Sequence, residues 1–200
     1  MLLALLLACA SQGPAVRHTV APDDVSMTAD VPEVQLAAAR LADARGRVRV
    51  LDREHVRMLA YAEDARRAAR AASQDLDRAD SELRLARSDG DAGRAAAAGR
   101  RVEATRRIRE RAAASEVWRA IEARAATARL NAAKAEVPLR RAELELRRAQ
   151  WLDARDRGDN YALRRFERHR AALRDAWEAA VRRQEVAVKE AEAARRRLEG

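Results

Sequence analysis

The sequence predicts an all-α fold: an elongated, antiparallel three-helix coiled-coil bundle with a projecting two-helix arm. Charged residues make up 36% of the 200-residue chain, the hydrophobic residues (48%) are mostly alanine, and aromatic residues reach only 3%. Apolar residues recur with a period near 3.5, and two glycine-containing breaks divide the pattern into three stretches. Because alanine buries only a methyl group, the helices must lie close together and stability must accumulate along their length.

The chain opens with a short apolar run that ends in its only cysteine. Residues 2–8 read Leu-Leu-Ala-Leu-Leu-Leu-Ala, and Cys9 follows. This pattern is typical of the apolar core of a signal peptide and is far below the ~20 residues that a membrane-spanning helix needs. Leu6-Leu7-Ala8-Cys9 resembles the lipobox of bacterial lipoproteins, whose cysteine is acylated and becomes the first mature residue. The resemblance implies that residues 1–8 are removed and that acyl chains on Cys9 anchor the protein to a membrane.

Two other interpretations of the cysteine stay open. Ala8-Cys9-Ala10 also fits the small-x-small cleavage site of ordinary secretion, and a lone cysteine can be an inert apolar residue. In the best-known lipoprotein systems, Asp after the cysteine retains the protein in the inner membrane. Ala10 stands there, so the resemblance implies an outer-membrane protein that faces the periplasm.

Residues 9–32 predict a flexible linker, because they hold Pro14, Pro22 and Pro32 and lack any apolar period. The resemblance to the lipobox implies that this linker is lipid-anchored at Cys9. A helix is expected from about residue 33 to residue 88. Its seam positions step by three and four without a break and are apolar apart from His55. The seam consists of Val34, Ala37, Leu41, Ala44, Val48, Leu51, His55, Met58, Ala62, Ala65, Ala69, Ala72, Leu76, Ala79, Leu83 and Ala86.

Residues 88–93, with two glycines and two aspartates, predict the end of the first helix and the cap of a second at about 94–157. The second helix has a thin apolar face as far as residue 115. From Trp118 onward the face broadens, which indicates contact with a second neighbour. Pro138 is expected to kink this helix without ending it. The broad face consists of three rows: Trp118/Ala125/Ala132/Leu139/Leu146, Ile121/Ala128/Ala135/Ala142/Ala149 and Ala123/Leu130/Val137/Leu144/Trp151.

Gly158 predicts a second turn, and a third helix is expected at about 160–198. Its inner side holds Phe166, Leu173, Trp177, Val181, Val188, Ala191 and Leu198. In an antiparallel arrangement, position i of the first helix faces about 182 − i of the second, and the third helix ends opposite Trp118. Residues 33–199 therefore predict one helical domain, in which residues 65–117 form the projecting arm.

The surface charge offers one candidate binding site. The net charge is +9, and all but two of the 41 basic residues are arginine, whose planar fork suits phosphate and carboxylate. The possible anion-binding residues cluster on the arm: Arg100, Arg101, Arg106, Arg107, Arg109 and Arg111. The alternative is a solvated helix face whose arginines pair with acids four residues earlier, as Arg107 would with Glu103.

No pattern in the sequence predicts catalysis, a cofactor or a metal site. His18, His55 and His169 are far apart, and no His/Cys group has the spacing of metal ligands. His55 is expected to be a polar seam residue that helps to fix register. Paired carboxylates fall on solvated helix faces, which do not raise the pKa of a carboxyl group as acid catalysis requires. The sequence therefore does not predict an enzyme.

The expected function is that of a lipid-anchored structural or scaffolding protein of the bacterial cell envelope. Its membrane contact is the lipid anchor, and its arm is expected to bind a protein partner or another copy of the chain. The alternative is an anion-binding envelope protein that uses its arginine surface for phospholipid, nucleic acid or acidic polymer. Nucleic acid is the least expected of these partners. A third class, a periplasmic chaperone that grips with helical arms, would need an exposed apolar lining that the sequence does not predict.

Overall fold

The computed structural model describes residues 19–156 and 161–199, and within these ranges the chain is helical with no strand. The helices are α1 (Pro22–Met27), α2 (Pro32–Ser88), α3 (Ala92–Asp153) and α4 (Leu163–Glu199). The all-α prediction is confirmed. Cys9 and the lipobox-like residues lie outside the described residues. None of the described helices has the length and apolarity that are needed to cross a lipid bilayer.

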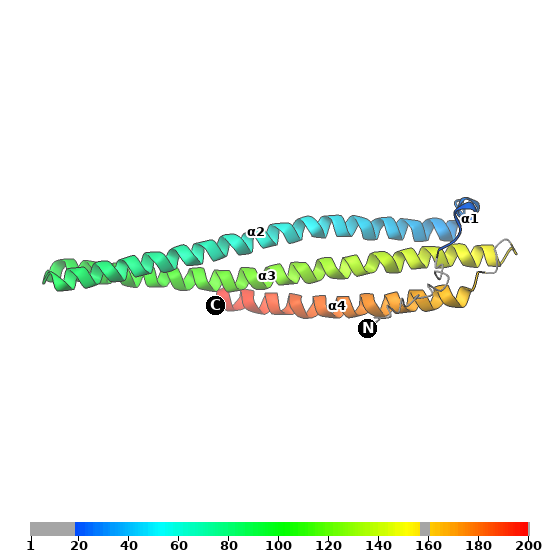
Figure 1. Ribbon diagram of the computed structural model, residues 1–200. Helices are drawn as coiled ribbons and strands as arrows, with labels where there is room; N and C mark the ends of the chain where they lie inside the picture. The colour runs from blue at the N-terminus through cyan, green and yellow to red at the C-terminus, as the bar shows by residue number, and fades with distance from the viewer. Residues whose placement is uncertain (1–18, 157–160, 200) are drawn as a thin grey trace, which may run out of the picture.

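Two long helices, α2 and α3, form an antiparallel hairpin (Figure 1). The turn between them depends on a glycine and an aspartate. Gly90 has a φ of +73°, a conformation that glycine adopts without steric cost. The carboxylate of Asp91 accepts a hydrogen bond from the Arg94 N–H at 2.9 Å and so caps the first turn of α3. The sequence predicted this turn correctly.

Ion pairs between the two sides of the hairpin mark its register. In each pair the two residue numbers add up to 182 or 183, so the predicted rule is confirmed to within one residue. Because the same relationship holds from the turn to the opposite half of the hairpin, the two helices stay in step over this whole length. The pairs are Arg94–Asp89, Arg101–Glu82, Arg66–Glu116, Arg129–Glu54 and Arg47–Glu136.

The predicted seam of α2 is the side that faces its neighbours. Every one of its positions is buried or partly buried. Burial is deepest near the ends of the helix, as at Ala44 (0% exposed) and Ala86 (1%), and His55 is partly buried in between. A period of 3.5 read from sequence therefore located the packed side of a 57-residue helix correctly.

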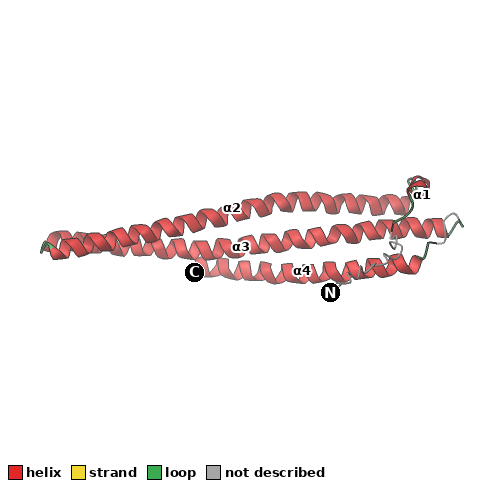
Figure 2. Cartoon of the chain, viewed as in Figure 1, coloured by secondary structure: helices red, strands yellow, loops and turns green. Residues whose placement is uncertain are grey.

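The third long helix, α4, packs antiparallel against α3, so that α3 lies between α2 and α4 (Figures 1 and 2). Near its C-terminal end, Ala191 and Arg195 border a groove beside Trp118 of α3. Beyond this point α2 and α3 continue alone. We call residues 65–117 the arm and the remainder the base. In α3 burial changes at the same place, because Val102 is the only buried residue before Ala123.

The ends of α3 and α4 differ from the sequence expectation. α3 ends at Asp153 rather than near residue 157, because a turn follows in which Asp156 adopts a positive φ of 49°. α4 begins at Leu163 rather than at residue 160. Leu198, which was expected on the inner side, is 40% exposed, because α3 offers no broad apolar face beyond Trp118. Pro138 lies within α3 without ending it, as predicted.

The linker prediction is wrong for residues 19–31, which pack against the base. Val20 is 5% exposed and joins a core cluster with Leu152 of α3 and Phe166 of α4. Thr28, just after α1, is fully buried. This packing could not be predicted from the sequence, because single buried residues in a short segment produce no periodic pattern of apolar residues. Pro22, which suggested a linker, instead begins α1.

Polar contacts hold the same segment in place. The carboxylate of Glu145 on α3 accepts the Val20 N–H at 2.9 Å. The Tyr161 hydroxyl accepts the Ala21 N–H at 3.1 Å and donates to Asp24 at 2.5 Å. The segment before α2 therefore forms hydrogen bonds both with α3 and with Tyr161, just before α4.

Candidate functional site

The six arginines singled out by the sequence all lie exposed on the arm, in α3. They do not form one cluster. Arg100, Arg107 and Arg111 are seven and four residues apart, so they follow one side of the helix. Arg109 is nine residues beyond Arg100, which places it about half a turn away around the helix axis.

Two of the six arginines already bind carboxylates. Arg101 reaches Glu82 of α2 at 2.7 Å, and Arg106 binds Glu103 at 2.9 Å. The predicted pairing of Glu103 with Arg107 is therefore replaced by the i,i+3 pair. Arg100, Arg107, Arg109 and Arg111 form no ion pair with any residue that the structure describes.

The row formed by Arg100, Arg107 and Arg111 continues the side of α3 that faces α4 in the base. Arg111 stands seven residues before Trp118, which borders the groove at the end of α4. Beyond Glu199, no helix that the structure describes covers this side of α3 along the arm (Figure 1). Rises of about 10 Å and 6 Å separate the three arginines along the axis. Such a row can contact successive phosphates of a polyanion or of a membrane surface, but it cannot enclose one small anion.

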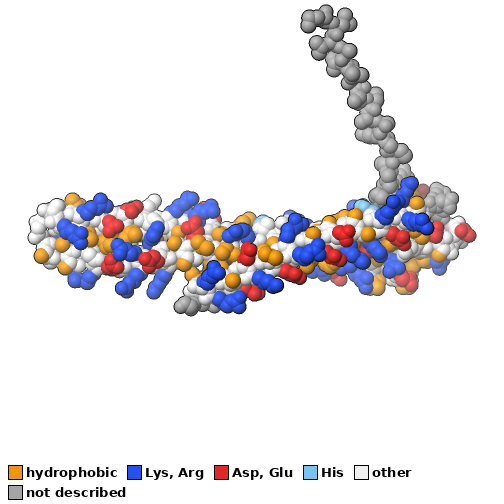
Figure 3. Space-filling view, turned by 90° about the horizontal axis from the view of Figure 1, so that it is seen from below, with side chains coloured by type: hydrophobic (Ala, Val, Ile, Leu, Met, Phe, Trp, Pro, Cys, Tyr) orange, Lys and Arg blue, Asp and Glu red, His pale blue; other side chains and the backbone are white. Residues whose placement is uncertain are grey.

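The charges of the face seen in Figure 3 are mixed. Figure 3 shows basic and acidic side chains interspersed along the visible face of both base and arm, with apolar side chains between them. Most pairs on this surface are between exposed groups, such as Arg78 and Asp75 at 3.4 Å, and pairs of this kind contribute little to stability. Much of the arginine therefore serves as an ordinary solvated helix surface.

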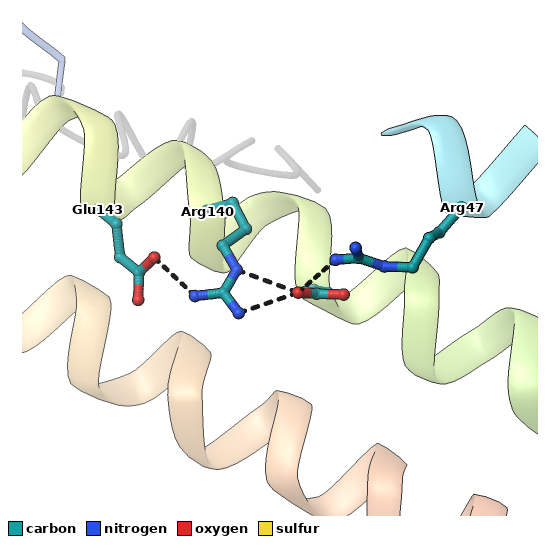
Figure 4. A network of polar contacts seen from close by, with 4 residues as sticks. Arg47, Arg140 and Glu143 are labelled. Atoms are coloured by element: carbon teal, nitrogen blue, oxygen red, sulfur yellow. Dashed lines mark hydrogen bonds and ion pairs between the residues drawn. The ribbon is translucent and has the colours of Figure 1, made fainter. Parts of the chain in front are cut away.

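One ion-pair network is different because its central carboxylate, that of Glu136, is largely removed from water. Glu136 of α3 accepts hydrogen bonds from Arg47 of α2 at 2.7 Å and from Arg140 at 3.0 Å (Figure 4). Arg140 also donates to Glu143 at 2.9 Å. Burial by itself would raise the pKa of Glu136, but the hydrogen bonds and charges of Arg47 and Arg140 lower that pKa below its usual value. The bond to Glu143, offset in part by burial, raises the pKa of Arg140.

Sequence reasoning identified only part of this network. The Glu136–Arg140 pair has the i,i+4 spacing that the sequence led us to expect between acids and arginines. Arg47 was missed, although the register rule could have found it, because 182 − 47 is 135. Sequence reasoning also missed a groove bordered by arginines from three helices, Arg40, Arg147, Arg170 and Arg174. Contacts between three helices leave no signal in the spacing of any one of them.

The two histidines that the structure describes do not come together. His55 lies partly buried in the seam, and His169 borders a depression that also involves Thr19 and Leu173. His18 lies outside the described residues. Among the residues that the structure does describe, no group of three or more His, Cys, Asp or Glu side chains is placed to hold a metal ion.

No protein-family model, curated protein or solved structure shows detectable similarity to this chain.

Proposed function

We propose that this chain is a lipid-anchored structural or scaffolding protein of the bacterial envelope, and not an enzyme. In this proposal the base is a three-helix coiled-coil bundle, and the arm binds a protein partner or a second copy of the chain. The observation that carries the proposal is the form of the molecule, since two long helices stay in register well beyond the end of the third (Figure 1). A slender hairpin offers a long surface for contact and little enclosed volume for chemistry.

The coiled-coil character of the base is supported by the seam of α2. Its positions repeat every 3.5 residues and all are buried or partly buried. Small residues predominate among the most deeply buried ones, such as Ala44 and Ala149, both 0% exposed. Small side chains allow helix backbones to approach closely, as the supercoiled arrangement requires.

The anchor would hold the base close to the membrane. Thr19 stands ten positions beyond Cys9, and the chain beside Thr19 is fixed to the base through Val20. Ten extended residues span at most about 36 Å. A protein acylated at Cys9 would therefore keep its base within that distance of the lipid and present the arm as its more mobile part.

The first experiment tests the anchor. Wild-type chain expressed in a bacterium should incorporate a fatty-acid label and sediment with the membranes. Cys9→Ser should incorporate no label and appear in the soluble fraction, whereas the neighbouring substitution Ser11→Ala should behave as wild type. Wild-type protein without any acyl label would contradict the lipoprotein proposal.

The second experiment tests the partner surface of the arm. Leu85 and Ile108 are 60% and 59% exposed there, and neither is required for packing. Crosslinking and affinity purification from envelopes should recover a partner with wild type and lose it with the double substitution Leu85→Glu and Ile108→Glu. Val186→Glu, at an exposed site of α4, is the control. Ala72 is less suitable, because it is buried within the hairpin and its replacement would disturb the arm itself.

A second candidate function, anion binding by the arm, is favoured by the unpaired row of Arg100, Arg107 and Arg111. The triple change to glutamine keeps helix propensity nearly constant and removes three charges. If the row binds phosphates, vesicles of phosphatidylglycerol should retain less of this variant and the salt dependence of binding should flatten. The control makes the same change at three exposed arginines of α4: Arg164, Arg165 and Arg168. Equal retention of both variants would exclude this function.

A further inference from the structure

A groove in the base gathers arginines from three helices. It has a volume of about 400 Å³ and is bordered by Arg40 of α2, Arg147 of α3, and Arg170 and Arg174 of α4. Leu146, which is buried at 3% exposed, also lines it. Four arginines from three segments that are distant in sequence therefore border one concave surface.

The groove is lined by two carboxylates, Glu33 and Glu143, and neither forms an ion pair with these four arginines. Glu143 is bound to Arg140 at 2.9 Å, outside the groove lining, and Glu33 forms no ion pair with a described residue. Four arginines against two carboxylates leave the groove with an excess of positive charge.

The arginines themselves are free of carboxylate partners within the part of the chain that the structure describes. Arg147 donates to the amide oxygen of Gln150 at 3.2 Å, which is a neutral acceptor. Arg40, Arg170 and Arg174 form no ion pair there. The Nε of Arg170 is buried and has no hydrogen-bond partner among these residues. Partial burial of an unpaired guanidinium is unfavourable, and a bound anion would offset that cost.

We propose that this groove binds a phosphate group, carried either by a lipid headgroup or by a soluble phosphate compound. Arginine forms paired N–H···O bonds with phosphate, and donors from three helices can reach different oxygens of one group. The volume accommodates a small headgroup, in contrast to the open row on the arm, whose arginines are spaced along an axis. This site is distinct from the arm and does not depend on the anchor.

Such a ligand would also bridge α2, α3 and α4. Because binding to the folded state alone raises stability in proportion to the logarithm of ligand concentration, phosphate should raise the melting temperature of the base. Sodium chloride at the same ionic strength supplies a control, since screening would weaken the mutual repulsion of the arginines without filling the groove.

The experiment uses the full-length chain with Cys9→Ser, which cannot be acylated. Inorganic phosphate and pyrophosphate are titrated by calorimetry, and vesicles of phosphatidylglycerol are compared with vesicles of phosphatidylcholine by flotation. The double variant Arg170→Gln/Arg174→Gln should bind about tenfold more weakly, because two charge-assisted contacts are lost. Arg183→Gln/Arg197→Gln removes two exposed charges from the same helix and should change binding less than about twofold.

Each result has a defined meaning. Binding of phosphate or pyrophosphate identifies a soluble ligand, whereas binding to phosphatidylglycerol vesicles alone identifies a headgroup. Absence of both in the Cys9→Ser chain overturns the proposal, as does an equal loss in the two double variants. Arg170→Lys/Arg174→Lys, which retains both charges, should bind with intermediate affinity. That result would show that the weaker binding of the glutamine variant does not come from misfolding. Because this chain has no anchor, failure here leaves the lipoprotein proposal unaffected.

Discussion

Arg47 of α2 and Glu136 of α3 form a hydrogen-bonded ion pair of 2.7 Å whose two sides differ in exposure. The side chain of Glu136 is 10% exposed and that of Arg47 is 51% exposed. The carboxylate is therefore the buried member, and a second arginine, Arg140, binds the same oxygen. A buried carboxylate between two arginines is stable while all three groups are present. Removal of one group lowers the stability of the fold, because it leaves a buried charge without its partner.

Glu136→Gln should lower the free energy of unfolding by about 1–3 kcal/mol, because Arg47 and Arg140 would both lose a charged acceptor. Urea unfolding followed by circular dichroism measures this change. Glu178→Gln is the matched control, since its 3.9 Å pair with Arg182 is exposed on both sides. The control should cost less than about 0.5 kcal/mol. If the two variants lose the same free energy of unfolding, the Glu136 network stabilises the fold no more than an exposed ion pair does.

The same carboxylate should make stability depend on pH. The pKa of Glu136 in the folded protein lies below its ordinary value of 4.5. A lowered folded-state pKa means that the stabilisation is fully present above pH 4.5 and is lost as the pH falls through the folded value. The stability difference between wild type and Glu136→Gln should therefore be constant near neutrality and shrink below pH 4.5. A difference that grows on acidification would contradict this assignment.

Excision of residues 66–117 should leave a folded base. Ala65 and Trp118 satisfy the register of the hairpin, so a short turn such as the chain's own Asp-Gly-Asp can join them without shifting either helix. Mean helicity per residue should stay close to that of wild type, and unfolding should remain cooperative. Excision of residues 66–120 joins Ala65 to Ile121 three positions out of register, and this control should be clearly less stable. Loss of helical circular dichroism in the first variant would refute the division into base and arm.

His55→Leu should leave stability unchanged or raise it by up to about 1 kcal/mol, because the seam would gain apolar contact. The opposite change at the preceding seam position, Leu51→His, should destabilise the hairpin. The melting temperatures of the two variants, compared with that of wild type, test both expectations. A marked loss in His55→Leu, or the disappearance of a bound metal from it, would instead indicate a ligand role for the histidine.

The sequence predicted the parts of the fold that repeat. The period of 3.5 located the seam of α2, and the glycine and aspartates near residue 90 located the turn, because both depend on local chemistry. The register of the hairpin followed from the turn. Packing of Val20 and Thr28 against the base could not be predicted, since isolated contacts between distant segments carry no period.

The candidate site was predictable only where its residues are neighbours in the chain. Arg100, Arg107 and Arg111 lie on one helix and could be found from composition. The pairing of Arg101 with Glu82 became visible only from the register, and it removed one arginine from the candidate set. The groove around Arg170 required knowledge of how α4 lies on α3, which depends on three-dimensional packing of mixed apolar and charged faces.

The end of α4 beside Trp118 has a mechanical consequence. The cross-section of the molecule falls there from three helices to two, and the bending stiffness of a beam rises steeply with its thickness. A sideways force on the tip near Gly90 therefore bends the arm while the base stays straight, and curvature is greatest just beyond Trp118. The molecule is therefore stiff over the base and more compliant over the arm.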